Sequence, residues 1–154
     1  MRELHVDQVA ETIANLVKEA NYVLEPDVTA ALEKARADEQ SPVGQAVLGQ
    51  LAENAELARS ERVPMCQDTG NALVFLEIGQ DLHLVGGDRY EAINRGVSRG
   101  YVDGYLRKSI LDDPIRRKNT GDNTPAFIYT DIVPGDKLRI RVATKGGGAE
   151  NMGQ

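Results

Sequence analysis

Residues 72–78, Ala-Leu-Val-Phe-Leu-Glu-Ile, form a nearly continuous apolar run of the length of a β-strand. Gly70-Asn71 precedes this run and Gly79 follows it, and residues of these types commonly mark the ends of strands. Because the apolar side chains follow one another with little alternation, they point to both sides of the backbone. The run therefore predicts a strand that is buried on both faces.

A long helix is expected after this strand. Gly86-Gly87-Asp88 breaks the chain and predicts the start of a helix over residues 89–106. One stripe of this helix carries Tyr90, Ile93, Val97, Tyr101 and Tyr105. Beside the stripe, a glycine recurs every four residues, at positions 96, 100 and 104. Each glycine inside a helix costs about 1 kcal/mol relative to alanine, so the pattern indicates either close packing of another backbone or a kinked helix.

Two further strands are expected over residues 126–133 and 137–144. Pro134-Gly135 joins them and suits a type II turn. In the second strand, large apolar side chains alternate with charged or small ones, so that one face is expected to be buried and the other exposed to solvent. The apolar positions are Leu138, Ile140 and Val142, and the alternating positions are Arg139, Arg141 and Ala143.

The first sixty residues are helical in pattern. The first helix places Val6, Val9, Ile13, Leu16, Val17 and Ala20 on one face. A shorter one begins near Pro26, with Val28, Leu32 and Ala35 on its apolar side, and a third begins at Ser41-Pro42 and ends near Ser60. The third carries Val43, Ala46, Val47, Leu51 and Ala55 inward.

These elements predict an α+β fold, with N-terminal helices followed by a small mixed or antiparallel sheet and one crossing helix. The expected organisation is a single domain over residues 1–154, with a helical front at residues 1–60 and a strand/helix part at residues 61–154. A chain of 154 residues has the common size of one domain.

Charge and composition exclude several classes of function. The chain has 18 basic and 24 acidic residues and a net charge of −6, which disfavours nucleic acid as a partner. No apolar run approaches the roughly 20 residues that cross a bilayer, and the N-terminus has no signal pattern. A single cysteine fits a reducing compartment. We therefore expect a soluble cytoplasmic chain that binds neither nucleic acid nor membrane.

Cys66 lies in a polar turn, Pro64-Met65-Cys66-Gln67-Asp68-Thr69-Gly70, just before the predicted strand. A lone cysteine is usually a small core hydrophobe, but these polar neighbours favour a nucleophile or a metal ligand. His5, expected in the first helix, and His83 are not obvious partners for it, and the usual zinc spacings are absent. Asp68-Thr69-Gly70 is also the tripeptide of aspartic proteases, in which the strand precedes the aspartate; here the strand follows it, which disfavours that interpretation.

Three other polar stretches are candidate sites. Gly146, Gly147 and Gly148 leave backbone N–H groups open to an anion beside Lys145, although glycine-rich turns are common. Arg107 and the basic triplet Arg116–Lys118 would ordinarily be solvated surface. The triplet belongs to a polar stretch, residues 110–124, that is expected to form a loop; its part at residues 119–124 would by itself be taken as a turn.

Three blocks taken together resemble a known family. They are Pro64 to Gly70 followed by an apolar strand, Asn119-Thr120-Gly121-Asp122-Asn123-Thr124-Pro125-Ala126, and Lys145-Gly146-Gly147-Gly148-Ala149-Glu150-Asn151. In order and spacing they resemble the class I fumarate hydratases, and the tartrate dehydratase alpha subunits share them. The resemblance covers most of the chain and is weakest over the N-terminal helices.

This resemblance implies an iron–sulfur hydro-lyase that acts on a small dicarboxylate, fumarate/malate or tartrate. Such enzymes hold a 4Fe-4S cluster through three cysteines, and its open iron acts as a Lewis acid on the hydroxyl. By the resemblance, Cys66 is the first cluster ligand, Gln67 and Asp68 contact the substrate, and Asp68 exchanges a proton or orients a catalytic group. Arg107 binds a carboxylate. The backbone of Gly146, Gly147 and Gly148 approaches the substrate.

The chain departs from the family in having no second cysteine. It therefore looks like the N-terminal portion of an alpha subunit. Its expected partners are the remaining part of that subunit and a beta subunit or domain, and we expect it to be inactive alone. The strand carrying Arg139 and Arg141 is interpreted as a face meant for missing chain, and the exposed apolar surface predicts self-association into a homo-oligomer. The alternative is a non-catalytic remnant or interaction domain that has lost the cluster.

Overall fold

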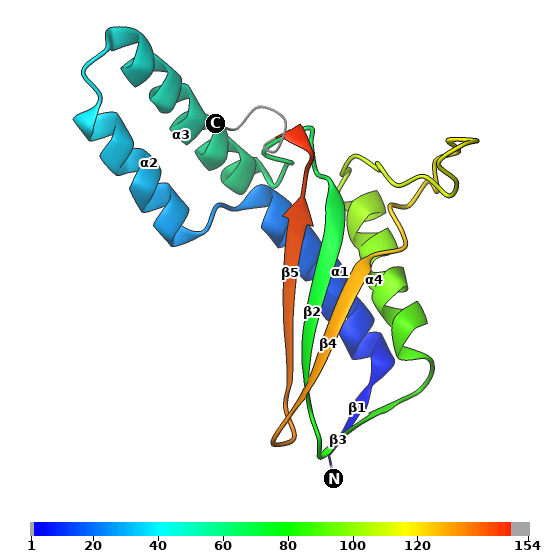
Figure 1. The fold of residues 1–154 in the computed structure, drawn as a ribbon. Coiled ribbons are helices and arrows are strands. Elements are labelled where there is room, and N and C mark those ends of the chain that lie inside the picture. The colour runs from blue at the N-terminus through cyan, green and yellow to red at the C-terminus, as the bar shows by residue number, and fades with distance from the viewer. Residues whose placement is uncertain (1, 149–154) are drawn as a thin grey trace.

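A computed structural model of the chain describes residues 2–148 (Figure 1). The elements are β1 (Arg2–His5), α1 (Val6–Tyr22), α2 (Pro26–Asp38), α3 (Pro42–Glu61), β2 (Asn71–Gly79), β3 (Leu82–Val85), α4 (Arg89–Asp103), β4 (Phe127–Val133) and β5 (Leu138–Lys145). The predicted α+β fold is confirmed: after the short strand β1, three helices are followed by a mixed three-stranded sheet and one crossing helix, α4.

Strand β2, the predicted apolar strand, is the middle strand of a three-stranded sheet in the order β4-β2-β5. It runs parallel to β4 and antiparallel to β5, so that Phe75 lies opposite Tyr129 on one side and Arg141 on the other. Strands β4 and β5 are joined at Pro134-Gly135 as predicted, but they do not pair with each other, because the connection passes around the end of β2. There the missing side chain of Gly79 leaves room, since a Cβ at this position would lie 2.3 Å from the Gly135 carbonyl oxygen.

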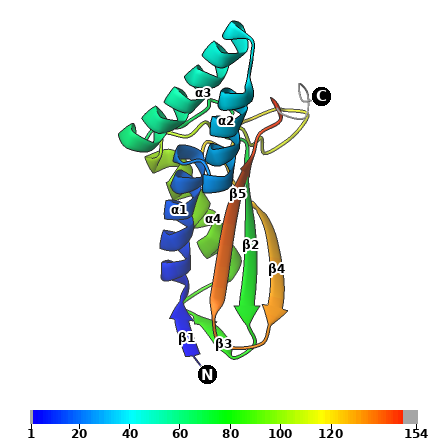
Figure 2. The ribbon, with the colours of Figure 1, turned by 90° about the vertical axis from the view of Figure 1, so that its left-hand side faces the viewer.

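The prediction that this strand is buried on both faces is wrong. Its side chains alternate, with Ala72, Val74, Leu76 and Ile78 buried, whereas Phe75 is 37% exposed. The reason is that α1 and α4 cover one face of the sheet, while no described element covers the other (Figure 2). Strand β5 follows its predicted alternation, since Leu138, Ile140 and Val142 pack against the core. The uncovered side of the three strands is called the open face below.

Helices α1 and α4 pack closely, as the glycine spacing in α4 predicts. A Cβ at Gly96 would lie 2.5 Å from the Ala10 carbonyl oxygen, and one at Gly100 would lie 3.0 Å from that of Ala14. The two backbones therefore approach more closely than any side chain at these positions would permit. The predicted start of α4 is confirmed, because the Asp88 side chain accepts a hydrogen bond from the Glu91 N–H at 2.9 Å.

The stripe expected on α4 is correct in its middle and wrong at its ends. Ile93, Val97 and Tyr101 are fully buried, but Tyr90 is half exposed and Tyr105 is 88% exposed. The helix ends at Asp103, and Tyr105 has a positive φ of 54°. The chain therefore turns away from the helix axis before Tyr105, which moves this side chain out of the stripe.

Helices α2 and α3 form a hairpin that projects from the body and is called the arm, residues 26–61 (Figure 1). The predicted caps are confirmed, with Ser41 accepting a hydrogen bond from Gly44 N–H and Pro42 in the first turn. The predicted inward faces are wrong. Helix α2 has no buried residue, and four of the five expected core positions of α3 are exposed because nothing described packs on that side: Val43, Ala46, Val47 and Leu51.

Two short strands were not predicted. Strands β1 and β3 pair in parallel, with Leu4 opposite Leu84, at the end of the body away from the arm (Figure 1). His5 was expected inside the first helix, but it is the residue before α1, and its ring accepts a hydrogen bond from the Asp7 N–H. Four residues are too few for the sequence to reveal an alternating pattern, so strands of this length leave little signal.

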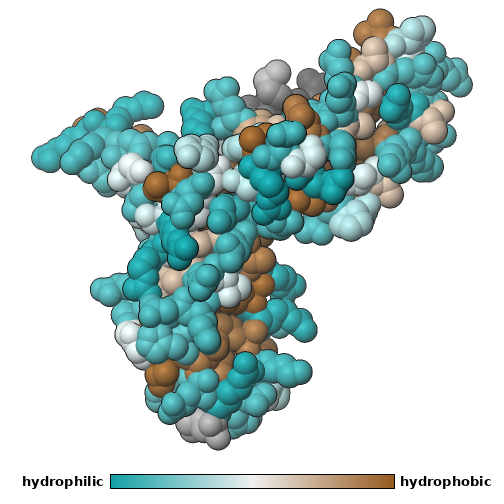
Figure 3. All heavy atoms as spheres, turned by 180° about the vertical axis from the view of Figure 1, so that it is seen from behind, coloured by the Kyte–Doolittle hydropathy of each residue, from teal (hydrophilic) through white to brown (hydrophobic). Residues whose placement is uncertain are grey.

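Apolar side chains gather on the body below the arm, as Figure 3 shows from behind. A hollow of about 580 Å³ runs along the sheet, lined by Leu16, Phe75, Tyr129, Ile140 and Val142 among others. Within residues 2–148, no helix is both long enough and apolar enough to span a membrane.

Candidate functional site

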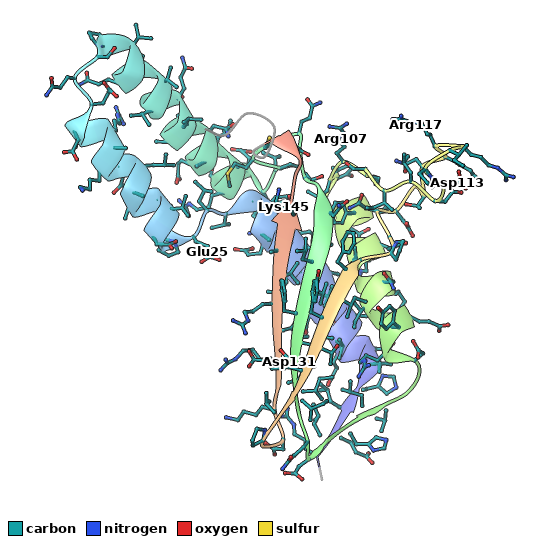
Figure 4. All side chains as sticks on the ribbon, in the orientation of Figure 1. Glu25, Arg107, Asp113, Arg117, Asp131 and Lys145 are labelled. Atoms are coloured by element: carbon teal, nitrogen blue, oxygen red, sulfur yellow. The ribbon has the colours of Figure 1, made fainter. Side chains whose placement is uncertain are left out.

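The predicted site residues meet at the end of the sheet where β2 begins and β5 ends. Three segments converge there: residues 64–70 before β2, residues 104–126 after α4, and residues 146–148 after β5. Figure 4 shows Lys145 at the end of β5 and Arg107 above it, at this end of the sheet. Each segment is a loop held by a neighbouring regular element, which is the usual arrangement for binding residues on a rigid scaffold.

Cys66 is exposed, as its polar neighbours predict, and does not belong to the core. It lines a shallow hollow of about 400 Å³ together with Pro64, Gln67, Thr69, Tyr105 and Arg107. Its Sγ accepts a hydrogen bond from the Asp68 N–H at 3.4 Å. The hollow therefore places a thiol, an amide and a guanidinium beside one another.

Asp68 lies against the glycines that follow β5. Its Oδ2 accepts a hydrogen bond from the Gly148 N–H at 3.0 Å. A Cβ at Gly146 would lie 2.6 Å from the same oxygen, so only a glycine lets the backbone pass this closely. At least one N–H of the three glycines thus binds a carboxylate of the chain itself. The family block continues with Ala149, Glu150 and Asn151, which lie outside the described residues.

Gly70 allows the first and third segments to meet. It has a φ of 58°, and a Cβ there would lie 2.0 Å from the Lys145 carbonyl oxygen. Any side chain at this position would collide with backbone, which cannot move aside cheaply. The turn that carries Cys66 and Asp68 is therefore seated directly on the end of β5.

The Arg107 segment is held by hydrogen bonds to its backbone. The Thr69 hydroxyl donates to the Arg107 carbonyl oxygen at 2.8 Å, so this bond holds the backbone and does not use the exposed guanidinium. The Tyr101 hydroxyl, at the buried side of the same region, donates to the carbonyl oxygens of Thr69 and Gly70 at 3.0 and 3.1 Å. Burial raises the pKa of Tyr101 to about 12, against the lowering effect of a hydrogen bond with Asn123.

Residues 119–125 form the wall behind these loops instead of a simple surface turn. Asn123 is completely buried and contacts Gly70, at the end of the first segment, and Ser109, near the start of its own segment. Burial raises the pKa of Asp122, but hydrogen bonds from Thr124, Ser98 and Thr120 outweigh it, so that the pKa lies below its usual value. No sequence pattern indicated Asn123, Thr69 or Tyr101 as organising residues. The available signal was that Thr69 lies in the first block of the family motif and Asn123 in the second, whereas Tyr101 lies in none of the three blocks.

The basic triplet lies away from the site. Arg116, Arg117 and Lys118 are exposed on a projecting loop, where Figure 4 shows Arg117 and Asp113, and none of the three lines the hollow that contains Cys66. The interpretation of this triplet as solvated surface is confirmed. Arg107 is distinguished from it by position, because it shares the hollow with Cys66 and Gln67.

The part of the chain that the structure describes contains no group of three or more His, Cys, Asp or Glu side chains that could hold a metal ion. Cys66 is the chain's single cysteine. Its exposed thiol at the rim of a hollow suits one position in a larger ligand set. The described residues do not by themselves form a complete metal site.

Comparison with known proteins agrees with this arrangement of blocks. The family model described as fumarate hydratase (Fumerase) matches residues 10–154, and the chain belongs to this family. The matched range includes all three segments of the site up to the end of the chain.

The relatives that the chain resembles are named either class I fumarate hydratase or L(+)-tartrate dehydratase subunit alpha. The chain is 34% identical over 139 residues to the anaerobic class I fumarate hydratase of Escherichia coli (strain K12), covering 86% of this chain and 25% of the relative. It is 38% identical over 104 residues to the aerobic class I enzyme of the same strain, covering 66% of this chain and 19% of the relative. It is 29% identical over 153 residues to the L(+)-tartrate dehydratase subunit alpha of Escherichia coli (strain UTI89 / UPEC), covering 97% of this chain and 50% of the relative. The chain thus spans about half the length of the tartrate dehydratase alpha subunit and a quarter or less of the two fumarate hydratases.

Proposed function

We propose that this chain is part of an iron–sulfur-dependent hydro-lyase that reversibly hydrates or dehydrates a small dicarboxylate. The first candidate reaction is fumarate to malate, and tartrate to oxaloacetate is the second. The observation that carries this proposal is the meeting of Cys66, Gln67 and Arg107 in one hollow, with Asp68 held by Gly148 beside it. Family membership and the names of the relatives support the same class of reaction.

The reaction sets clear requirements for the side chains. Hydration of fumarate adds a hydroxyl to one carbon of the double bond and a proton to the other, and dehydration reverses both steps. A guanidinium binds a carboxylate through two parallel hydrogen bonds, so Arg107 is proposed to orient one end of the dicarboxylate. Gln67 is proposed to bind beside it, with the backbone of Gly146, Gly147 and Gly148 approaching the substrate.

Asp68 is proposed as the group that holds or passes the proton. A carboxylate that is fixed by a hydrogen bond at one oxygen keeps the other oxygen available in a defined direction, and here Oδ2 is the oxygen that Gly148 holds. Oδ1 is therefore the proposed site of proton transfer. This role requires that the glycine turn remain in place, which links the third block of the motif to the first.

Cys66 is proposed to supply one ligand of a 4Fe-4S cluster in the complete enzyme. One thiol does not hold such a cluster, and the described residues offer no further ligand group around it. We therefore propose that the other two ligands belong to the remaining part of the alpha subunit. A beta subunit or domain is the second proposed partner, which the word alpha in the relatives' names supports.

The organisation proposed for the chain is a single domain over residues 1–154 that forms the N-terminal portion of the alpha subunit and assembles as a homo-oligomer. We also propose a cytoplasmic location, because a cluster-ligating thiol requires reducing conditions. Alone, the chain is proposed to be inactive.

The test is anaerobic iron–sulfur reconstitution of this chain, alone and together with the remaining alpha and beta parts. We expect a visible cluster absorbance and hydration of fumarate only in the mixture, and we expect Cys66→Ser to abolish both. A folded chain that gives no cluster and no activity in the mixture would contradict the proposal and would favour a non-catalytic binding role.

A matched pair of variants tests the proposed role of Arg107. Arg107→Lys keeps the positive charge but removes the bidentate geometry, so we expect the KM for fumarate to rise about tenfold. Arg117→Lys is the control, because Arg117 is exposed on the projecting loop away from the hollow. Equal effects of the two substitutions would show that position in the hollow does not matter.

A further inference from the structure

Asn123 is a fully buried polar residue, with 0% of its surface exposed, in the wall behind the site. A buried carboxamide is costly unless its donors and acceptor are paired, because it gives up its hydrogen bonds to water. Its backbone has a positive φ of 64°, a conformation that asparagine adopts more readily than most other residues. Both observations indicate that this position is specifically suited to asparagine.

The Asn123 side chain joins the two loops that carry the candidate site residues. Its Oδ1 accepts hydrogen bonds from the Ser109 N–H at 2.6 Å and the Ile110 N–H at 3.2 Å, in the segment that follows Arg107. Its Nδ2 donates to the Gly70 carbonyl oxygen at 2.9 Å, at the end of the turn that carries Gln67 and Asp68. One planar group therefore fixes the separation of two segments that are far apart in sequence.

The chemistry of these bonds requires both halves of a carboxamide. An acceptor is needed toward Ser109 and Ile110, and a donor is needed toward Gly70. An ionised carboxylate offers acceptors only, and a serine hydroxyl is too short to span the same gap. The Tyr101 hydroxyl also binds the Gly70 carbonyl oxygen, but its other backbone bond goes to Thr69 in the same turn, so these bonds do not replace the link to Ser109 and Ile110.

We propose that Asn123 is a positioning residue that sets the Arg107 guanidinium at the correct distance from Gln67 and Asp68. This inference rests on the proposed function, because a small dicarboxylate, the proposed substrate, is the ligand that both loops would bind. Asn123 does not touch the hollow itself. It acts on the substrate through the backbones of Ser109 and Gly70, so its loss displaces the groups that grip the two ends of the ligand.

The test compares Asn123→Asp with Asn119→Asp in this chain. Asn119 is a matched control, since its Oδ1 accepts from the Gly121 N–H at 2.7 Å and its Nδ2 donates to the Lys108 carbonyl oxygen at 3.0 Å, but it is exposed. Both substitutions keep the acceptor and replace the amide donor with an oxygen. Any effect of the new acid group alone is thus present in both variants.

The first readout is NMR of the folded variants. We expect Asn123→Asp to shift the signals of the Arg107 Nε–H and the Gln67 side-chain amide, and to speed hydrogen exchange at Ser109 and Ile110 at least tenfold. Asn119→Asp should leave the Arg107 and Gln67 signals in place and change exchange at Ile110 less than twofold. The Ser109 amide is not compared between the two variants, because it shares a peptide group with the Lys108 carbonyl that Asn119 binds. If Asn123→Asp lowers the unfolding temperature but leaves the Arg107 and Gln67 signals unmoved, the residue is merely structural and the proposal is overturned.

The second readout is titration with L-malate. We expect Asn123→Asp to weaken binding at least tenfold and Asn119→Asp less than twofold; equal affinities in wild type and Asn123→Asp overturn the proposal. If the wild-type chain does not bind L-malate, the proposed function loses its support in this chain, while the loop signals still decide the role of Asn123.

If Asn123→Asp does not fold, hydrogen exchange of the wild-type chain decides whether the inference holds. The Ser109 and Ile110 amides must then exchange at least a hundredfold more slowly than in an unstructured peptide, and unprotected amides overturn the inference.

Discussion

Asp68 accepts a hydrogen bond from the backbone of Gly148, eighty positions further along the chain, at 3.0 Å. The glycine turn therefore encloses an internal carboxylate, and its shape depends on the absence of side chains at specific positions. Gly146 is such a position, because a Cβ there would lie 2.6 Å from Asp68 Oδ2. Gly147 is not, because a Cβ there would have no atom within 4 Å.

Gly146→Ala should therefore displace the Asp68 carboxylate and break its bond to Gly148. We expect the free energy of unfolding to fall by about 1 kcal/mol, the typical net value of one hydrogen bond. The Gly148 amide proton should move upfield in the NMR spectrum. Gly147→Ala should leave the Gly148 signal in place and change the stability by less than about 0.5 kcal/mol. A Gly148 signal that moves equally in both variants would contradict this account.

The same substitution should have opposite effects at two glycines within helices. Gly96→Ala places a Cβ 2.5 Å from the Ala10 backbone, so we expect a loss of about 2–3 kcal/mol as α1 and α4 are forced apart. Gly49→Ala in α3 approaches no atom other than the flexible end of Arg36, at 3.8 Å. There the higher helix propensity of alanine should add about 0.5–1 kcal/mol. Urea denaturation of both variants measures this, and a stabilising Gly96→Ala would show that α1 and α4 do not pack as described.

Stability should fall in strongly basic solution because of Tyr101. Burial raises the pKa of this phenol from 10.0 to about 12 in the folded chain, so between these pH values the unfolded state loses the proton and the folded state keeps it. The contribution is complete below pH 10 and is lost as the pH rises toward 12, by at most about 1.4 kcal/mol per pH unit. Denaturant unfolding from pH 8 to pH 11.5 measures the slope.

Tyr101→Phe is the control for this pH dependence. It removes the ionisable hydroxyl together with the bonds to Thr69 and Gly70, so the variant should be less stable than wild type at pH 8. Its stability should then fall less steeply above pH 10. If the free energy of unfolding falls equally steeply above pH 10 in both proteins, groups other than Tyr101 cause the loss of stability. Tyr22 is one such group, since burial also raises its pKa.

The open face should cause self-association. Phe75 and Tyr129 stack on it with ring centroids 5.0 Å apart, and both are substantially exposed. We expect light scattering of the wild-type chain to give a mass that rises with concentration, and the double variant Phe75→Thr/Tyr129→Thr to remain monomeric. Threonine is chosen because it keeps the β propensity of both positions.

An arm variant serves as the control for this experiment. Val43→Thr removes an apolar side chain that is 73% exposed on the arm, away from the sheet. It should leave association unchanged. If Val43→Thr removes association and the sheet variant does not, the arm is the contact surface; a wild-type chain that stays monomeric at high concentration contradicts both.

Regular elements with long patterns could be predicted from the sequence because one local signal decided each. The Ser41 cap, the Asp88 cap and the four-residue glycine spacing of α4 are all short-range features, and all three correspond to the structure. Burial could not be predicted in the same way. An apolar residue such as Val47 or Phe75 is exposed or buried according to what packs on it, which depends on chain far away in sequence or on another molecule.

The side chains around the hollow could be identified from the motifs, whereas the residues that organise them could not. Cys66 and Gln67 stand out because they lie in the first family block, and Arg107 stands out because the family resemblance implies that it binds a carboxylate. Asn123 looks like one more turn residue, and its importance follows only from the contact with Gly70, 53 positions away. The pairing order of the strands was likewise hidden, since Pro134-Gly135 predicts a turn but not that β2 lies between the strands it joins.

The bonds that hold the site are made to main-chain atoms. Thr69, Tyr101 and Asn123 bind carbonyl oxygens or N–H groups of the neighbouring loops, and none of these bonds uses the side chain of Gln67 or Arg107. The set of bonds made by Thr69, Tyr101 and Asn123, called the frame here, therefore does not depend on which side chains the loops carry at the hollow. Mutation can replace the displayed groups one at a time while the loops keep their course, so a change of substrate preference does not require a new fold. Such a frame is a natural starting point for divergence, and equally for deliberate redesign of specificity.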